Sequence, residues 1–127
     1  MTLKTVHKII DSSELSSAEM AKICAIAADD KKASDIVILE VGKLTSYTDY
    51  FIICSAPSDR QVEAIARNVQ DAMRERGVKA IGVEGLETSS WVLIDFGDTI
   101  FHCFTDAARE YYDLEGFWVD APKLDYQ

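Results

Sequence analysis

Two stretches of the chain carry apolar residues at positions i, i+3, i+4 and i+7, the spacing of one face of an α-helix. The first, over residues 20–27, follows the capping-box pattern of residues 16–19, in which a hydroxyl and a carboxylate satisfy amide groups of the first turn. Residues 11–14 offer a competing start for this helix. The second, over residues 58–73, opens on a similar pattern and is expected to stop at Gly77.

Shorter runs rich in β-branched and aromatic residues predict strands. These runs are residues 35–41, 49–54, 78–83, 91–95 and 99–104. Phe96-Gly97-Asp98 is the expected hairpin turn between the last two, and a short helix from Asp106 to Leu114 follows, capped by Thr105. The order α-β-β-α-β-β-β-α predicts an α/β fold: a single mixed β-sheet of about five strands with helices packed on it.

The hairpin around Trp91 allows two interpretations. Strand alternation places Trp91 and Leu93 on one face of the sheet, with His102 of the partner strand beside them, and Val92 and Ile94 on the other. If helices cover only the second face, the first is an exposed apolar surface of the kind that binds proteins. If helices cover both faces, Trp91 belongs to the core. Periodicity alone leaves both interpretations open.

Five large side chains crowd the C-terminal region, at positions 111, 112, 114, 117 and 118. Helical spacing lets Tyr111, Leu114 and Trp118 share one face, which favours docking of a terminal helix onto the sheet. We expect Phe117 and Trp118 to hold this helix to the core.

Length and charge narrow the function. The 127 residues suit one domain, and the net charge of −9 disfavours sequence-independent binding to nucleic acid phosphates while favouring basic partners. No apolar run is long enough for a membrane span and the first residues do not resemble a signal peptide, so a cytoplasmic protein is expected. Cys24, Cys54 and Cys103 are expected to be buried free thiols.

Motifs for catalysis and for cofactor or metal binding are missing from the sequence. There is no phosphate-binding glycine loop and no C-x-x-C pair, and neighbouring His102 and Cys103 would point to opposite faces of a strand. An anion at the helix start after Ser55-Ala56-Pro57 remains open. Asp95 and His102 could form an acid–base pair across the hairpin, but no activated nucleophile accompanies them. We therefore predict no catalytic residue, metal or cofactor.

Six segments, in order, together resemble the ribosomal silencing factor family, also called Iojap-like proteins. They are Asp35-Ile36-Val37-Ile38-Leu39-Glu40-Val41, Thr48-Asp49-Tyr50-Phe51-Ile52-Ile53-Cys54, Ser58-Asp59-Arg60-Gln61-Val62, Val83-Glu84-Gly85, residues 91–102 (WVLIDFGDTIFH) and residues 109–118 (REYYDLEGFW). The resemblance implies one domain over residues 1–127, with an N-terminal helical region (1–32), a family core (33–121) and a tail (122–127).

The resemblance implies a fold related to nucleotidyltransferases without their catalytic motif. It also implies binding to the large ribosomal subunit through ribosomal protein L fourteen, which blocks joining of the small subunit and represses translation when nutrients are limited. Homodimers are implied as well. A factor for large-subunit biogenesis and a remnant nucleotidyltransferase-like enzyme are the alternatives.

The residues expected to bind the partner are spread over the hairpin and the C-terminal motif. They are Trp91, Leu93, Asp95, His102, Tyr112, Leu114 and Glu115. Trp91 would be the apolar anchor, and the carboxylates would meet basic residues of the ribosomal protein.

Overall fold

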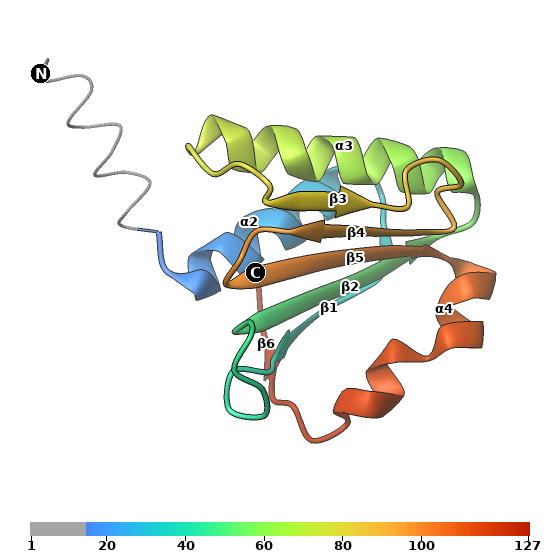
Figure 1. Cartoon of the computed structure of the whole chain (residues 1–127). Coiled ribbons are helices and arrows are strands. Elements are labelled where there is room, and N and C mark those ends of the chain that lie inside the picture. The colour runs from blue at the N-terminus through green and yellow to red at the C-terminus, as the bar shows by residue number, and fades with distance from the viewer. Residues whose placement is uncertain (1–14) are drawn as a thin grey trace, which may run out of the picture.

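The computed structural model describes residues 15–127, which form one sheet with helices on both of its faces (Figure 1). In chain order the elements are α2 (Ser17–Asp30), β1 (Ser34–Glu40), β2 (Tyr50–Ala56), α3 (Asp59–Glu75), β3 (Gly82–Glu84), β4 (Trp91–Asp95), β5 (Thr99–Thr105), α4 (Asp106–Tyr112), the 3₁₀ helix η1 (Leu114–Trp118) and β6 (Lys123–Leu124). Among these residues no helix is both long and apolar enough to cross a membrane.

The sheet is mixed, as the sequence predicts. Its strand order is β3-β4-β5-β2-β1-β6, and the central pair β2 and β5 is parallel while the other neighbours are antiparallel. It has six strands where about five are expected, because Leu124 and Lys123 pair with Ile38 and Leu39 of β1. Two paired residues in the tail are too few to produce a recognisable alternation.

The capping patterns mark the helix starts correctly. The Ser16 hydroxyl accepts from the Glu19 amide at 3.1 Å, and the Glu19 carboxylate accepts from the Ser16 amide at 3.3 Å. The competing start at residues 11–14 lies outside the described residues. Gly77 ends α3 with a φ of 82°, as expected, and the Val78 amide still donates to the Met73 carbonyl at 2.9 Å. Because the Val78 amide takes part in this helix end, it does not begin the strand predicted over residues 78–83, and β3 covers only Gly82–Glu84.

The two faces of the sheet are covered to different extents. Helices α2 and α3 lie along one face, where Val92, Ile94 and Phe101 are fully buried (Figure 1). The other face carries a smaller core around Phe51 and Phe104, and only α4 and η1 lie over it. Trp91 and Leu93 are at the margin of this smaller core, where they are partly buried. The fold therefore leaves part of one sheet face at β4 without a helix.

The three cysteines all belong to the core beneath α2 and α3. Cys24, Cys54 and Cys103 are free and fully buried, and Cys54 lies beside Cys103 in the β2–β5 register, which confirms the expected buried thiols. Burial raises the pKa of the Cys24 and Cys54 thiols, and the neighbouring Cys103 raises that of Cys54 further. Thiols in this state are inert as nucleophiles.

We predict that a disulfide-exchange reagent such as dithiobis-nitrobenzoate labels the cysteines within minutes in denaturant. In the native protein the same reagent should label none of them over the same time. Addition of denaturant should release three equivalents of reactive thiol per chain. Fast labelling of even one thiol in the native state would contradict the burial described here.

Candidate functional site: a docking surface around Trp91

Strand β4 presents Trp91 on the sheet face that α2 and α3 leave free. In the β4–β5 register Trp91 lies opposite Phe104 and Leu93 lies opposite His102, so these four side chains share one face. Along β4, Trp91 and Leu93 are partly exposed, while Val92 and Ile94, which alternate with them, are buried. This is the alternation that the sequence predicts.

The Trp91 ring is held from several sides. It stacks on Phe104 with ring centroids 4.8 Å apart and lies 4.9 Å from the ring of Tyr112 in α4. Its indole Nε1–H donates to Nδ1 of His102 at 3.1 Å. Trp91 is thus packed against the smaller core and open to solvent on its remaining side. The sequence left open whether Trp91 is a core residue or a surface residue, and it is partly each.

A groove of about 240 Å³ runs beside Trp91, lined by Glu84, Gly85, Trp91 and Leu93. Gly85 in the lining has a left-handed conformation with a φ of 91°. A Cβ atom at this position would collide with the Trp91 carbonyl oxygen, so glycine is required. Glu84 is exposed and makes no ion pair within residues 15–127. The groove therefore combines apolar walls with one unpaired carboxylate.

His102 lies behind Trp91 and is only 3% exposed. Burial lowers its pKa to about 4, so the imidazole is neutral at physiological pH. In this position it supports the surface and does not itself form it. Asp95 pairs with Ile100 in the register, and its carboxylate accepts from the Gly97 amide at 2.7 Å. The structure does not bring Asp95 and His102 together as an acid–base pair.

The C-terminal residues of the predicted site occupy different positions. Tyr112 is 46% exposed and extends the aromatic surface next to Trp91. Leu114 packs on the smaller core, and the Glu115 carboxylate accepts from Nε of Arg109 at 2.8 Å. Trp91, Leu93 and Tyr112 therefore form the accessible surface, while Leu114 and Glu115 lie partly buried beside it.

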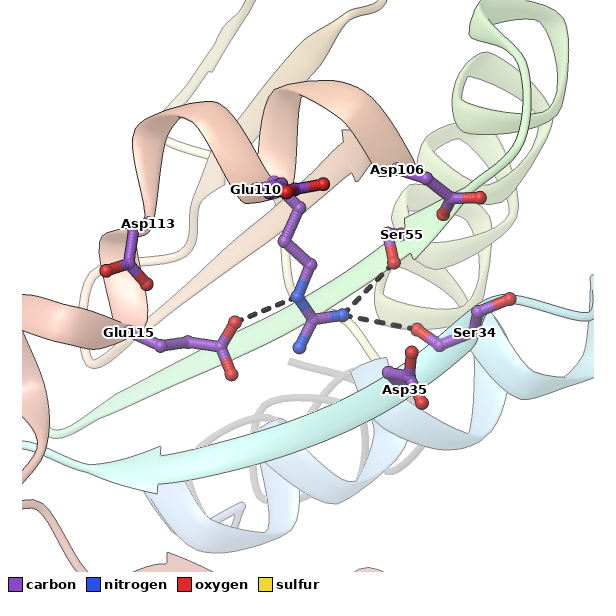
Figure 2. A pocket seen from close by; sticks show the side chains of 8 residues that line it. Ser34, Asp35, Ser55, Asp106, Glu110, Asp113 and Glu115 are labelled. Carbon is purple, nitrogen blue, oxygen red and sulfur yellow. Dashed lines mark hydrogen bonds and ion pairs between the residues drawn. The ribbon is translucent and has the colours of Figure 1, made fainter.

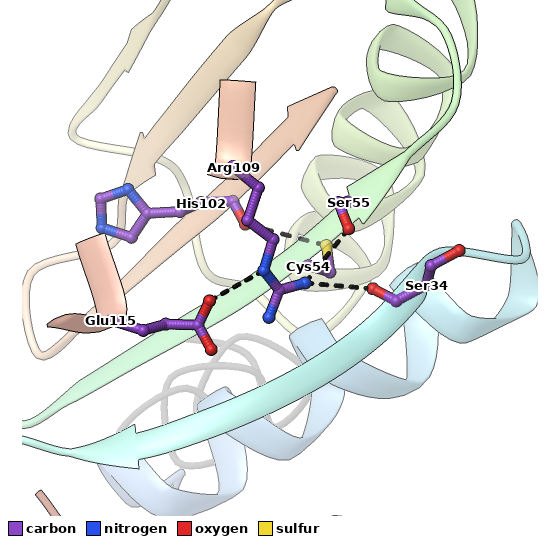
Figure 3. Close-up of polar contacts among 6 residues, drawn as sticks. All are labelled: Ser34, Cys54, Ser55, His102, Arg109 and Glu115. Atoms are coloured by element: carbon purple, nitrogen blue, oxygen red, sulfur yellow. Dashed lines mark hydrogen bonds and ion pairs between the residues drawn. The ribbon is translucent and has the colours of Figure 1, made fainter. Parts of the chain in front are cut away.

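Arg109 is the residue that the sequence interpretation missed. Its side chain is 14% exposed, and besides Glu115 it donates to the Ser55 hydroxyl at 3.2 Å and the Ser34 carbonyl at 3.4 Å (Figure 3). It thereby joins α4 to η1, β2 and β1. No local pattern reveals this role, because its partners are as many as 75 residues away.

Arg109, Ser34 and Ser55 also line a second hollow of about 400 Å³, whose other lining residues Figure 2 shows. Carboxylates surround it, at Asp35, Asp106, Glu110, Asp113 and Glu115. The Ser55 hydroxyl is taken by Arg109, and Ser58 caps α3 by accepting from the Gln61 amide at 3.3 Å. Negative charge around this hollow repels anions, which argues against the anion site considered after Ser55.

One expectation for the terminal segment is wrong. Trp118 does hold η1 to the sheet, with its ring 5.2 Å from Phe51 in an edge-to-face contact, but Phe117 is 80% exposed and Tyr111 is 82% exposed. Asp113 ends α4 in a left-handed conformation with a φ of 45°. This turn interrupts the helical phase, so spacing counted from Tyr111 does not continue to residues 117 and 118.

Fold and site together define a class of protein: a small α/β domain with a partly exposed aromatic surface beside one unpaired carboxylate. Within residues 15–127, no group of three His, Cys, Asp or Glu side chains is arranged to hold a metal ion. The sequence profile of the family described as "Ribosomal silencing factor during starvation" matches residues 14–127. The chain belongs to this ribosomal silencing factor family, which confirms the resemblance of its six segments.

Individual relatives agree with this assignment. The chain is 45% identical over 104 residues to "Ribosomal silencing factor RsfS" of Bacillus subtilis, covering 82% of this chain and 88% of that protein. A crystal structure from Chromobacterium violaceum superimposes with a TM-score of 0.80 at 40% identity, covering 82% of this chain and 87% of the other. A more distant mouse relative, "Mitochondrial assembly of ribosomal large subunit protein 1", is 31% identical over 70% of this chain and 40% of its own length.

We predict that Arg109→Leu lowers the free energy of unfolding by about 2 kcal/mol, because hydrogen bonds from a largely buried charged group to three elements are lost. Arg74→Ala is the matched control: its pair with Asp71 is 60% and 64% exposed, so less than about 0.5 kcal/mol should be lost. Urea titration measures both. Equal effects of the two substitutions would contradict the role given to Arg109.

We also predict that stability falls on mild acidification. The folded-state pKa of His102 lies near 4, below its ordinary 6.5, so the unfolded chain binds the proton more readily and stability is lost as pH falls through this window. Between pH 7 and pH 5 the loss should be about 2 kcal/mol. Urea titrations of wild type and His102→Asn test this, since the variant should lack this loss. If His102→Asn loses as much stability as wild type on acidification, groups other than His102 cause the loss.

Proposed function

We propose that this protein binds the large ribosomal subunit through ribosomal protein L fourteen, blocks joining of the small subunit and so represses translation when nutrients are limited. The main support is family membership combined with an accessible Trp91 groove on an otherwise covered sheet. The proposed action needs no chemistry, because a bound protein excludes the other subunit by its volume.

The groove has the composition that a basic protein partner requires. Aromatic anchors in a desolvated pocket supply most of the binding energy at protein interfaces, and Trp91, flanked by Tyr112, is such an anchor. Glu84 at the rim is available to a lysine or arginine whose aliphatic stem lies on Leu93 and the indole ring. The net charge of −9 would accelerate association with a basic surface at low salt.

The remaining predicted residues support this surface in different ways. His102 and Leu114 pack behind it, Glu115 fixes η1 through Arg109, and Asp95 shapes the hairpin turn. The proposal therefore assigns direct contact to Trp91, Leu93 and Tyr112. It also includes a cytoplasmic location and the homodimer implied by the family, which the sedimentation mass of the free protein would test.

A role in large-subunit assembly is the second candidate, favoured by the name of the mouse relative, which refers to assembly of the large subunit. Both roles require the same first step, attachment to the large subunit. They differ in which particles carry the protein in cells: mature subunits for silencing and immature subunits for assembly.

We predict that Trp91→Ala weakens binding to purified large subunits about 30-fold, as expected when an interface anchor worth about 2 kcal/mol is removed. Ile26→Ala is the control, since Ile26 is 50% exposed on α2, on the opposite side of the sheet. Co-sedimentation at two salt concentrations measures both variants, with circular dichroism to check folding. A folded Trp91→Ala protein that binds like wild type would contradict the docking surface.

A further inference from the structure

We propose that His102 is a positioning residue: its buried imidazole holds the Trp91 indole in the orientation that forms the wall of the docking groove. This proposal rests on the proposed function for its consequence in binding. Its structural part concerns the free protein alone and can be tested without a partner.

The hydrogen bond between the two rings has only one possible direction. An indole Nε1–H can donate but not accept, so Nδ1 of His102 must be the acceptor over their separation of 3.1 Å. The imidazole must then be neutral, with its proton on Nε2. A protonated ring would turn a second N–H toward the indole and break the contact.

This arrangement leaves a polar atom without a partner. Nε2 of His102 is buried and has no hydrogen-bond acceptor within residues 15–127. The neighbours of the His102 ring are aromatic: its centroid lies 5.0 Å from that of the nearly perpendicular Phe51 ring and 6.3 Å from that of Phe104. A buried donor without an acceptor destabilises the fold, and an apolar side chain would avoid this cost. His102 is therefore a poor choice for stability alone.

What His102 contributes is a directional contact that packing cannot supply. Without it, Trp91 would rest on Phe104 and on Tyr112, which is itself 46% exposed. Stacking restricts the ring plane but allows rotation and sliding within that plane. The hydrogen bond from Nε1 fixes one edge of the indole ring to His102 of β5. It therefore also fixes the ring surface that lines the groove together with Leu93 and Glu84.

A fixed anchor binds more tightly than a mobile one, because less side-chain freedom is lost on association. For one aromatic side chain this effect is roughly 3- to 10-fold in affinity. The inference thus separates two roles: Trp91 makes the contact, and His102 prepares Trp91 for it.

The test uses three variants of the full chain. His102→Leu removes the acceptor while keeping an apolar side chain in the core, and His102→Asn keeps an acceptor at the position of Nδ1. Trp91→Phe removes the donor from the other side. The indole proton of Trp91 is followed by NMR through its exchange with solvent, with Trp118, the only other tryptophan, as internal reference.

We expect slow exchange of the Trp91 indole proton in wild type and at least 10-fold faster exchange in His102→Leu. The urea midpoint of His102→Leu should be equal to or higher than that of wild type, while its affinity for purified large subunits falls roughly 3- to 10-fold. His102→Asn should restore slow exchange and affinity, even if it is less stable. Trp91→Phe should bind at least as weakly as His102→Leu, because it loses part of the anchor's contact area as well as the donor.

Two results would overturn the proposal. One is unchanged exchange in His102→Leu; the other is a loss of stability in His102→Leu with unchanged affinity, which would make His102 an ordinary core residue. If His102→Leu does not fold, Trp91→Phe still decides, because wild-type affinity there would exclude a role for the hydrogen bond. If Trp91→Ala binds normally, the proposed function fails, but the exchange measurement still decides whether His102 orders Trp91.

Discussion

The Arg109 network is the constraint on which the docking surface depends. The guanidinium connects α4 to Glu115 of η1, to Ser34 at the start of β1 and to Ser55 near the end of β2. This connection holds α4 and η1 against the second face of the sheet (Figure 3). Helix α4 carries Tyr112, whose ring centroid lies 4.9 Å from that of Trp91. Arg109, whose side chain is 14% exposed, thus secures the helix that places Tyr112 beside Trp91.

The uneven cover of the sheet explains where a partner can bind. The parallel pair β2 and β5 lies at the centre and is buried on both faces, as parallel strands require. Strands β3 and β4 form one edge, and there α3 covers one face while the other carries Trp91 and Leu93. The segment after β5 runs through α4 and η1 to β6 at the opposite edge of the sheet. An accessible apolar margin is therefore a consequence of the topology.

Local patterns predicted most elements of the fold. The capping residues Ser16 and Ser58, the stop at Gly77 and the alternation from Trp91 to Asp95 depend on neighbours a few residues away, and the structure confirms them. The parts that sequence did not predict depend on distant partners or on single backbone angles. Pairing of β6 with β1 and the contacts of Arg109 are distant, and the left-handed Asp113 reverses the expected exposure of Phe117.

Trp91 shows why periodicity could not choose between core and surface. Its ring is hydrogen-bonded to the buried His102 and stacked on Phe104, yet one side of the ring is exposed to solvent. The alternation of hydrophobic and polar residues cannot encode an environment that is buried on one side and exposed on the other.

Locally unfavourable features gather around this residue. Ser89 before it has a φ angle of 54°, Asp113 after Tyr112 has 45°, and Nε2 of His102 lacks a hydrogen-bond partner within residues 15–127. Each costs stability that simpler residues would preserve. Left-handed angles also occur at Lys32 and Asp35, away from the groove, so the Trp91 region differs in combining them with an unpartnered imidazole. Stability given up at Ser89, Asp113 and His102 is what would be expected if the position of the Trp91 ring mattered for the proposed binding.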